Sequence, residues 1–418
     1  MKDTLKQHLP GLVSFYEDLH ANPEISFFEK ETSKKLSAVL TTAGFTSSTP
    51  VGKYDDNTLT CYGVVAVLSN GDGPTILVRA DMDALPLQEK TNAAHASSVH
   101  HLDELGRSIP VMHACGHDLH VVTLAGTAQV MAATKKNWRG TLVFVGQPAE
   151  ERAGGARALL ADGLYDNWPV PDYALSQHCD PNLAVGQVGL CPGWAMANVD
   201  MLDIIIHGIG AHGAMPHEGR DPIVLAAELI SAFQTIVSRS INPVDTGVVT
   251  VGSIHGGTKS NIIPDEVKLQ LTIRSFTDAV RSRILSEIKR MTHHLALAHG
   301  LPDTLLPEII HLEEEYFPAL YNDPELTTTA KAVFGQVFGE DNVKHKQPTT
   351  GGEDFSEYGR TGHKVPLLMF RVGTSPTDVD LEKQPGCHSP FFLPMAGPSI
   401  ETGVTAMTSL LHHLMGGK

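Results

Sequence analysis

The sequence has few cysteines, few aromatic residues, no strongly basic segment and no long apolar run. Five cysteines in 418 residues are odd in number and widely spaced, which argues against a disulfide framework and predicts reduced thiols. Lysine and arginine total 31 against 47 aspartates and glutamates, so the formal net charge is −16 and a nucleic acid is not an expected partner. No apolar stretch approaches the roughly 20 residues of a membrane span, and the N-terminus lacks the apolar core of a signal peptide. We therefore expect a cytoplasmic protein without a membrane partner.

Histidine is the residue type that the chain has in excess. It occurs 22 times, as often as phenylalanine and tyrosine together, which occur 14 and 8 times. The length fits two or three domains at roughly 150 residues per domain, and 42% hydrophobic residues allow each to bury a full core. The sequence therefore predicts a globular protein of several domains whose histidines need a chemical explanation.

Short β-branched runs alternate with longer helical patterns over the first 190 residues. This rhythm predicts a parallel or mixed sheet with helices on both faces. The expected strands are 63–68, 75–79, 141–145 and 173–176, and the expected helices are 29–43, 118–134 and 155–161.

A different rhythm begins after Gly193. It predicts an α+β sandwich of one small sheet and two helices. The expected strands there are 199–206, 247–254, 265–273 and 308–317, the expected helices are 221–238 and 277–298, and a helix at 324–338 and a strand at 366–372 then restore the first pattern. We therefore predict an α/β fold in which a discontinuous domain with a mixed sheet, residues 1–195 and 318–418, carries an inserted α+β sandwich, residues 196–317.

The segment around Cys115 carries the first candidate for chemistry. Cys115 and His117 flank Gly116 just ahead of a predicted helix that Asp118 could cap, and a tight turn there can direct both side chains at one ion. Thiolate and imidazole both bind divalent transition metals. The alternative is a buried free cysteine beside solvated histidines.

Adjacent carboxylates follow another predicted strand. Glu150 and Glu151 lie side by side, and desolvating two like charges is costly unless a cation compensates. One of them can then be a metal ligand and the other a base. For this pair the alternative is a solvated loop without a metal. His178 and His388 are each a single histidine after a predicted strand, and the alternative for each is a histidine that binds no metal.

Most of these candidates share one position, the carboxyl end of a predicted strand, where open α/β sheets place their sites. Asp81 and Asp83 follow a predicted strand in the same way. Five potential ligands are one too many for a closed tetrahedral zinc site and suit two metals that share a bridge. These five are Cys115, His117, Glu151, His178 and His388.

Seven motifs are spread along nearly the whole chain, at 20–26, 79–86, 113–118, 148–151, 211–217, 260–264 and 351–355. They read HANPEIS, RADMDALP, HACGHD, PAEE, AHGAMPH, SNIIP and GGEDF. In this order they resemble the M20 metallopeptidases, and specifically the aminoacylase-like amidohydrolases that include hippurate hydrolases and auxin-conjugate hydrolases.

The resemblance implies two divalent metal ions per subunit. The implied ligands are Cys115 as the bridge, His117 and His178 on one ion, and Glu151 and His388 on the other. Asp83 would orient a ligand, whereas Asp81 stands where more distant relatives have a metal-binding histidine and is not counted as a ligand. Mixed sulfur, nitrogen and oxygen ligands admit Zn, Mn, Co or Ni.

The resemblance also implies an activity, the hydrolysis of the amide bond of N-acyl amino acids or related small amide conjugates, with Glu150 as the general base. His212 of the inserted domain matches a donor to the oxyanion, and Asn261 and Arg274 match residues that hold the carboxylate of the substrate. The inserted domain would serve as a lid and would form a homodimer or higher homo-oligomer, in which His212 reaches the neighbouring subunit. The alternative within the family is a carboxypeptidase or dipeptidase that acts on short peptides.

Two other classes of protein compete with this prediction. The pattern G-x-G-x-x-G at 208–213 suggests a dinucleotide-binding oxidoreductase, but Pro216 and its neighbours obstruct the helix that such a site needs. A non-catalytic, metal-stabilised binding protein is the second competitor, and it is disfavoured because Glu150 beside a ligand is superfluous for structure.

The remaining polar residues near the motifs are given no catalytic role. We expect His95, His100 and His101 in solvent, His113, His120 and His217 in packing or ligand support, and Glu353 and Asp354 in a segment that lines the pocket.

Overall fold

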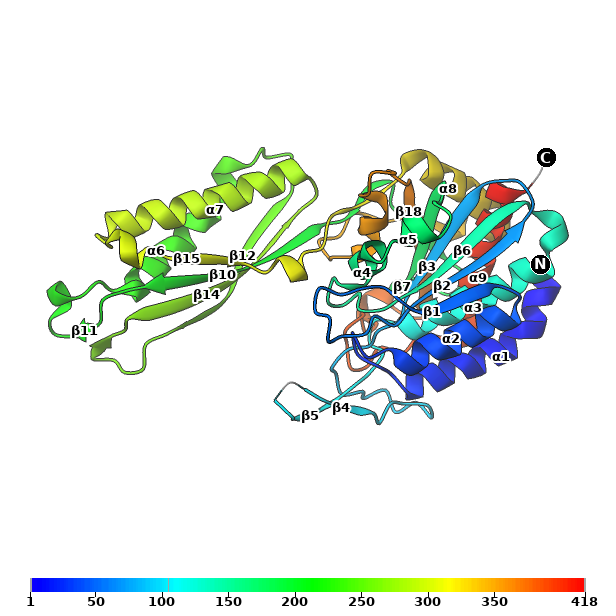
Figure 1. Ribbon diagram of the computed structural model, residues 1–418, viewed down its shortest axis with the longest axis horizontal. Helices are drawn as coiled ribbons and strands as arrows, with labels where there is room; N and C mark the ends of the chain where they lie inside the picture. Colours follow the sequence, from blue (N-terminus) through cyan, green and yellow to red (C-terminus); the bar gives the residue numbers. More distant parts are fainter. Residues whose placement is uncertain (1, 104, 417–418) are drawn as a thin grey trace. The chain divides into compact units, whose positions relative to one another are not determined.

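The computed structural model describes residues 2–103 and 105–416, which divide into two compact units (Figure 1). The first unit comprises the chain up to residue 195, residues 321–347 and the chain from residue 354 onward. The second unit comprises residues 196–320 and 348–353. The second unit thus also includes 318–320 and the short segment 348–353, which the sequence analysis placed in the discontinuous domain. Backbone pairing gives the reason, because Val199 pairs with Phe317 and Met196 pairs with Thr349.

The first unit is built on an eight-stranded mixed sheet, which confirms the predicted fold class. β3 pairs in parallel with β6 and β7, and β7 with β18, whereas β1, β2 and β6 are joined by antiparallel pairing. The strands, in spatial order, are β1 (Thr46–Val51), β2 (Gly63–Asn70), β6 (Gly140–Gln147), β3 (Thr75–Asp81), β7 (Tyr173–Ala184), β18 (Leu367–Ser375), β8 (Val188–Leu190) and β17 (Val343–His345). The polar residues that follow β3 and β6 therefore meet at one edge of the sheet, because these strands are parallel neighbours.

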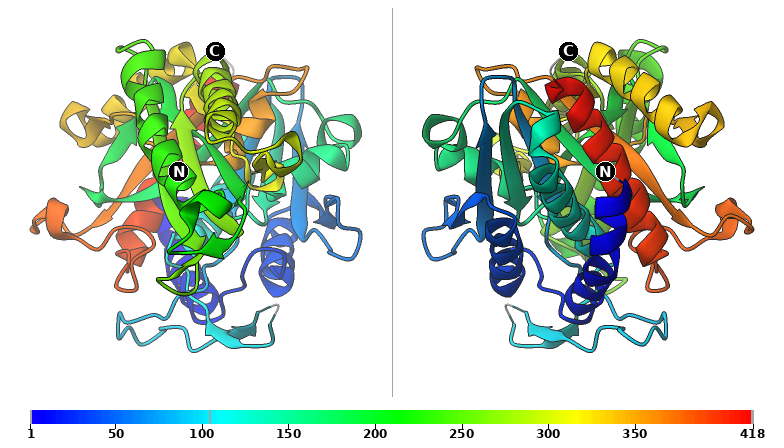
Figure 2. Two further views of the ribbon diagram at one scale, coloured as in Figure 1. Left: turned by 90° about the vertical axis from the view of Figure 1, so that its left-hand side faces the viewer. Right: turned by 90° about the vertical axis from the view of Figure 1, so that its right-hand side faces the viewer.

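Helices cover both faces of this sheet. On one face α1, α3 and α9 lie side by side, as Figure 2 (right) shows, and their apolar side chains form the main core with Ile76 and Val78 of β3. On the other face Arg79 is fully buried against the short helical turn Asp354–Gly359. The helices are α1 (Lys2–Ala21), α2 (Lys30–Thr42), α3 (His117–Ala133), α4 (Gly155–Ala161), α5 (Leu164–Asn167), α8 (Pro324–Phe338) and α9 (Ala396–Met415).

The second unit is a four-stranded antiparallel sheet with two helices on one face (Figure 2, left). Its elements are β12 (Gly247–Gly256), β14 (Glu266–Ser275), β10 (Asn198–His207), β15 (Glu308–His311), α6 (Pro222–Thr235) with a π-helical turn (Ile236–Ser240), and α7 (Asp278–Ala298). Burial alternates along β14, so one face packs under the helices. β15 is shorter than the predicted 308–317, because the turn Glu313–Glu315 interrupts it.

Small elements complete the chain. They are the pairs β4 (His100–Leu102) with β5 (Ser108–Pro110), β9 (Gly193–Met196) with β16 (Leu320–Asn322), and β11 (Ala211–His212) with β13 (Ile262–Ile263).

Helix α6 is more apolar than expected from the sequence. By length and composition alone, the stretch Pro222–Ser240 is long and apolar enough to cross a membrane. Leu225, Leu229 and Phe233 pack into the core of the second unit, whereas Ile223 and Val224 are 42% and 47% exposed. The helix therefore has one apolar face against its own sheet and a second apolar strip on the surface.

Candidate active site

The turn before α3 carries Cys115 and His117. Gly116 caps the helix with φ +80°, and a Cβ at this position would lie 2.6 Å from the Cys179 Sγ, so only glycine fits the turn. The expected cap by Asp118 is wrong, because Asp118 lies inside the first turn and accepts a hydrogen bond from His20 Nδ1 at 2.7 Å.

The loop after β6 carries the two glutamates. Ala149 has φ +48°, a strained value for a residue with a side chain, and the loop is held from both sides. Ala149 N donates to the buried Glu29 carboxylate at 2.7 Å, and Glu151 N donates to Asp83 at 3.0 Å. These contacts fix the direction in which Glu150 and Glu151 leave the sheet.

The structure brings all five predicted ligands together with Glu150. The Cys115 Sγ lies 3.5 Å from His178 Nε2, and His388 Nε2 lies 3.3 Å from Glu151 Oε1. His117 Nε2 lies 3.8 Å from Glu150 and 3.9 Å from Glu151. Two triads result that share one thiol, Cys115 with His117 and His178, and Cys115 with Glu151 and His388, each with its donor atoms within 4.8 Å of one another.

These residues fit divalent cations. His117 Nε2 is buried and has no hydrogen-bond partner among the described residues, a costly state that a cation relieves. His117 Nδ1 lies 3.2 Å from Asp83, and His178 Nδ1 lies 2.8 Å from the Cys179 carbonyl oxygen. Both contacts favour the tautomer in which Nε2 keeps its lone pair for a metal.

The two buried histidines respond to their surroundings in opposite ways. Burial opposes the charge on His117, but the neighbouring Asp81 and Asp83 carboxylates outweigh it and raise the pKa of His117 to about 10. Burial lowers the pKa of His178 to about 3, so His178 is neutral and can act as a ligand. A cation bound between the carboxylates would replace the proton of His117, so we expect metal binding to release protons.

A buried network of polar side chains lies next to the candidate ligands. Arg79 donates to Asp81 at 2.6 Å and to Asp354 at 2.9 Å, and His120 Nδ1 lies 2.5 Å from Asp81. Asp81 thus has structural partners, and His120 is buried against it, in line with the packing or supporting role expected for this histidine. Asp354 is fully buried, so its predicted place in a pocket lining is wrong.

Not all of the histidines expected in solvent are solvated. His100 is exposed, but His95 is not simply solvated, because its ring packs at 5.2 Å from the His20 ring. His101 lies 4.4 Å from the Phe28 ring. Sequence reasoning also missed two supporting residues, Ser26 and Glu29; Ser26 lies within one of the quoted motifs, and Glu29 follows it.

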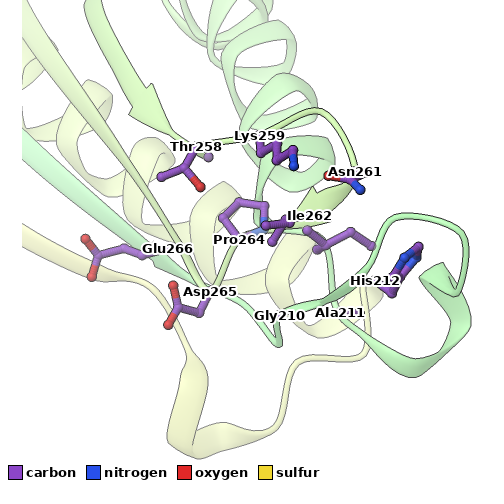
Figure 3. Close-up of a pocket in the computed structure, with 12 residues that line it drawn as sticks. Gly210, Ala211, His212, Thr258, Lys259, Asn261, Ile262, Pro264, Asp265 and Glu266 are labelled. Atoms are coloured by element: carbon purple, nitrogen blue, oxygen red, sulfur yellow. The ribbon is translucent and has the colours of Figure 1, made fainter.

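The second unit holds a pocket of about 810 Å³. His212 and Asn261 both line it, and Figure 3 shows them at one end, with Asp265 and Glu266 at the other. His212 Nδ1 accepts a hydrogen bond from Ala214 N at 3.0 Å, which leaves Nε2 to donate to a ligand.

Arg274 is not among the described residues that line this pocket. It lies on β14, eight residues beyond Glu266, which corresponds to about 27 Å along an extended strand. Its guanidinium donates to Thr272 and to the Thr350 carbonyl oxygen, each at 3.2 Å. Within one second unit the structure therefore brings His212 and Asn261 together but places Arg274 far from both.

Known proteins resemble this chain over most of its length. A profile of Peptidase family M20/M25/M40 matches residues 77–413. N-acetylcysteine deacetylase of Bacillus subtilis (strain 168) is 33% identical over 88% of this chain and 89% of its own length. IAA-amino acid hydrolase ILR1-like 4 of Arabidopsis thaliana is 34% identical, covering 91% and 80%, and thermostable carboxypeptidase 2 of Saccharolobus solfataricus is 32% identical, covering 90% and 88%.

A solved structure from Bacillus subtilis, described as a dinuclear metal binding peptidase from the M20 family, matches with a TM-score of 0.75. It is 29% identical and covers 97% of this chain and 98% of that chain. That protein is described as binding two metal ions, and this chain has thiol, imidazole and carboxylate groups that could hold metal ions. The chain therefore belongs to peptidase family M20/M25/M40 and is a metal-dependent hydrolase of amide bonds.

Proposed function

We propose that the protein hydrolyses the amide bond of N-acyl amino acids with two divalent ions, Zn, Mn, Co or Ni, in each subunit. The observation that carries the proposal is the pair of triads that share Cys115 next to a carboxylate, Glu150, that neither triad requires. When bound, such ions lower the pKa of a water molecule and polarise the amide carbonyl.

The residues of this chain then have distinct tasks. Glu150, with its carboxylate 3.8 Å from His117, would take the proton from the attacking water and return it to the leaving amine. His212 Nε2 would donate a hydrogen bond to the oxygen that becomes negative. Asn261 and Arg274 would hold the carboxylate of the amino acid, a task that suits the forked guanidinium of arginine.

The distance along β14 has a consequence for this arrangement. Arg274 and the pocket with His212 and Asn261 are about 27 Å apart along one strand, farther than a small N-acyl amino acid can span. If all three residues contact one substrate, they must come from two copies of the chain. This favours a homodimer in which His212 and Asn261 act on the site of the neighbouring subunit.

The second unit offers a surface for this dimer. The exposed strip of α6 includes Ile223 and Val224, and β12, next to α6, is a ten-residue edge strand. The opposite edge, β15, has only four residues and carries charge at Glu308. Long unprotected edges and apolar strips favour pairing with a second copy, so we assign the interface to α6 and β12.

The substrate panel decides between this function and its alternative. Metal-free protein is reconstituted with each of the four metals in turn and given N-acetyl and N-benzoyl amino acids, dipeptides and the C-terminal amides of each. We expect hydrolysis of the N-acyl amino acids with a free carboxylate. A preference for dipeptides would instead support a carboxypeptidase, which the relative from Saccharolobus solfataricus favours, and hydrolysis of no amide with any metal would contradict both.

The role of Glu150 has its own test. Glu150→Gln keeps the size of the side chain but removes the base, so kcat should fall about 10²- to 10⁴-fold while two metals stay bound. Turnover on the best substrate and metal content by mass spectrometry are measured together, with Glu17→Gln, at an exposed position of α1, as the matched control. Wild-type turnover in Glu150→Gln would reject Glu150 as the base.

The cytoplasmic location is proposed on the cysteines. All five lie within the described residues and are free thiols, the state that a reducing compartment maintains.

A further inference from the structure

Two cysteines outside the ligand set lie against the loops that carry metal ligands. Cys179 directly follows His178 on β7, and Cys387 directly precedes His388. Their sulfur atoms are 3.9 Å apart, although the residues are 208 positions apart in the chain. One member of each candidate metal triad therefore has a thiol as its chain neighbour, and the two thiols touch.

The same thiols also contact the turn that holds the shared ligand. The Cys179 thiol donates to the Cys115 carbonyl oxygen at 3.1 Å. His388 N donates to the Ala114 carbonyl oxygen at 2.8 Å, and His388 has φ +65°, an unusual value for a residue with a side chain. Three segments that carry candidate ligands thus meet around this pair of sulfur atoms. A shift of either sulfur will therefore displace these segments.

The pair is reachable from solvent on one side. Cys387 is partly exposed, whereas Cys179 is only 3% exposed. Cys387 also contacts the Cys115 thiol, whereas Cys61 and Cys191 have no such thiol contact among the described residues. A partly exposed cysteine in contact with a buried one is an arrangement in which a first reaction at the surface can be resolved by a second in the interior.

We propose that Cys179 and Cys387 form a reversible disulfide that disables the metal centre. The oxidant is a low-molecular-weight disulfide. The Cys387 thiolate attacks one of its sulfurs, forming a mixed disulfide and releasing one thiol; the Cys179 thiolate then attacks the Cys387 sulfur, forms the protein disulfide and expels the second thiol. The two protons lost by the cysteines leave on the two released thiols, so the protein is oxidised by two electrons and the reagent is reduced by two.

The effect on the site follows from geometry. A disulfide requires about 2.05 Å between its sulfurs, so the two sulfurs must approach by about 1.9 Å from their present separation of 3.9 Å. This draws together the backbone that carries His178, in one triad, and the backbone that carries His388, in the other. Metal sites tolerate displacements of only a few tenths of an ångström, so both triads lose affinity.

The test uses the full-length, metal-loaded protein and oxidised glutathione. We expect non-reducing peptide mass spectrometry to show the peptides of Cys179 and Cys387 linked with a loss of about 2 Da. Bound metal and amide hydrolysis should fall at least tenfold and should recover after addition of dithiothreitol and metal. Metal content and linkage are read without substrate, so the inference, which rests on the proposed metal centre, can be judged even if the proposed substrate is wrong.

Variants separate this pair from general thiol damage. Cys179→Ala and Cys387→Ala, each compared with its own activity and metal content before oxidation, should lose sensitivity to oxidised glutathione, whereas Cys191→Ala should remain as sensitive as the wild type. A link from Cys387 to Cys115 instead, glutathione adducts without a link, or a complete Cys179–Cys387 link with unchanged metal content would each overturn the proposal.

Discussion

Asp83 contacts three parts of the candidate metal centre through one carboxylate. Its Oδ1 lies 3.2 Å from His117 Nδ1, and its Oδ2 accepts from Ser26 at 2.7 Å and from Glu151 N at 3.0 Å. It is 1% exposed, so no water can replace these contacts easily. One carboxylate therefore orients the imidazole of one triad and the glutamate loop of the other.

Replacing Asp83 should weaken the metal centre without removing a ligand. We expect Asp83→Ala to lower metal affinity about 10- to 100-fold, because His117 loses the partner that fixes its tautomer. Competition with a chelator measures the affinity, and Ser26→Ala, which removes only one of the three contacts, should have a smaller effect. Equal affinities in wild type and Asp83→Ala would refute this role.

His20 is a buried cation that stabilises the fold at neutral pH. Burial opposes its charge, but hydrogen bonds to Asp118 at 2.7 Å and Glu89 at 3.2 Å outweigh burial and raise the pKa of His20 to about 10. In the unfolded chain the pKa of histidine is about 6.5. Because the folded state binds this proton more tightly, the contribution is complete below about pH 6.5 and is lost as the pH rises towards 10.

The charge on His20 can be tested by comparing the unfolding free energies of the wild type and of His20→Asn across a range of pH. The excess in unfolding free energy of wild type over His20→Asn should shrink between about pH 6.5 and about pH 9.5. Urea titrations at several pH values measure it, and His100→Asn, at an exposed position, serves as the control. A constant or growing excess would contradict the assigned charge.

Single residues show what the sequence could and could not predict. The five candidate ligands and Glu150 lie together as expected from the sequence, where motifs and residue chemistry pointed to all of them and predicted strand ends to Glu150, Glu151, His178 and His388. His95 and Asp354 were misjudged, because their packing depends on partners far along the chain, such as His20 for His95 and Arg79 for Asp354. Polar residues within the chain's folded interior cannot be told from surface residues without knowledge of those partners.

At the scale of elements, strands were easier to predict than their ends. The β-branched runs of β2, β3 and β6 lie where expected, and α4 and α8 match the predicted ranges 155–161 and 324–338. β15 ended early because a turn of three glutamates replaced its second half. The cap of α3 was misassigned because the left-handed conformation of Gly116, which begins that helix, leaves no mark in the hydrophobic pattern.

Arg274, on strand β14, should distinguish substrates with a free carboxylate from their amides. Arg274→Ala should raise KM about 10- to 100-fold for substrates with a free carboxylate and much less for their amides, because the lost interaction is a charge-assisted hydrogen bond. Paired KM values for acid and amide measure this difference, with Arg239→Ala on the exposed end of the π-helical turn as control. An equal rise for acid and amide would remove Arg274 from carboxylate binding.

At the scale of the whole molecule, the apolar strip of α6 predicts assembly. Val224→Glu places a charge at the centre of the proposed interface, so the protein should become monomeric and, if His212 acts on the neighbouring subunit, should also lose hydrolysis. Light scattering after gel filtration gives the mass, and Val170→Glu, another exposed valine, should stay dimeric. A monomeric wild type, or a dimeric Val224→Glu, would reject this interface.

The order of strands in the large sheet affects how the chain must fold as it is made. β18, residues 367–375, lies between β7 and β8, yet the ribosome reaches it only after all four strands of the second unit's sheet. The inserted unit can therefore complete its sheet while the first unit still lacks an inner strand. Until β18 is synthesised, β7 is an edge strand with unpaired backbone groups. Such an edge can pair with strands of other chains and cause aggregation. Newly made chains should thus depend most on chaperones during the interval between the synthesis of residues 184 and 375.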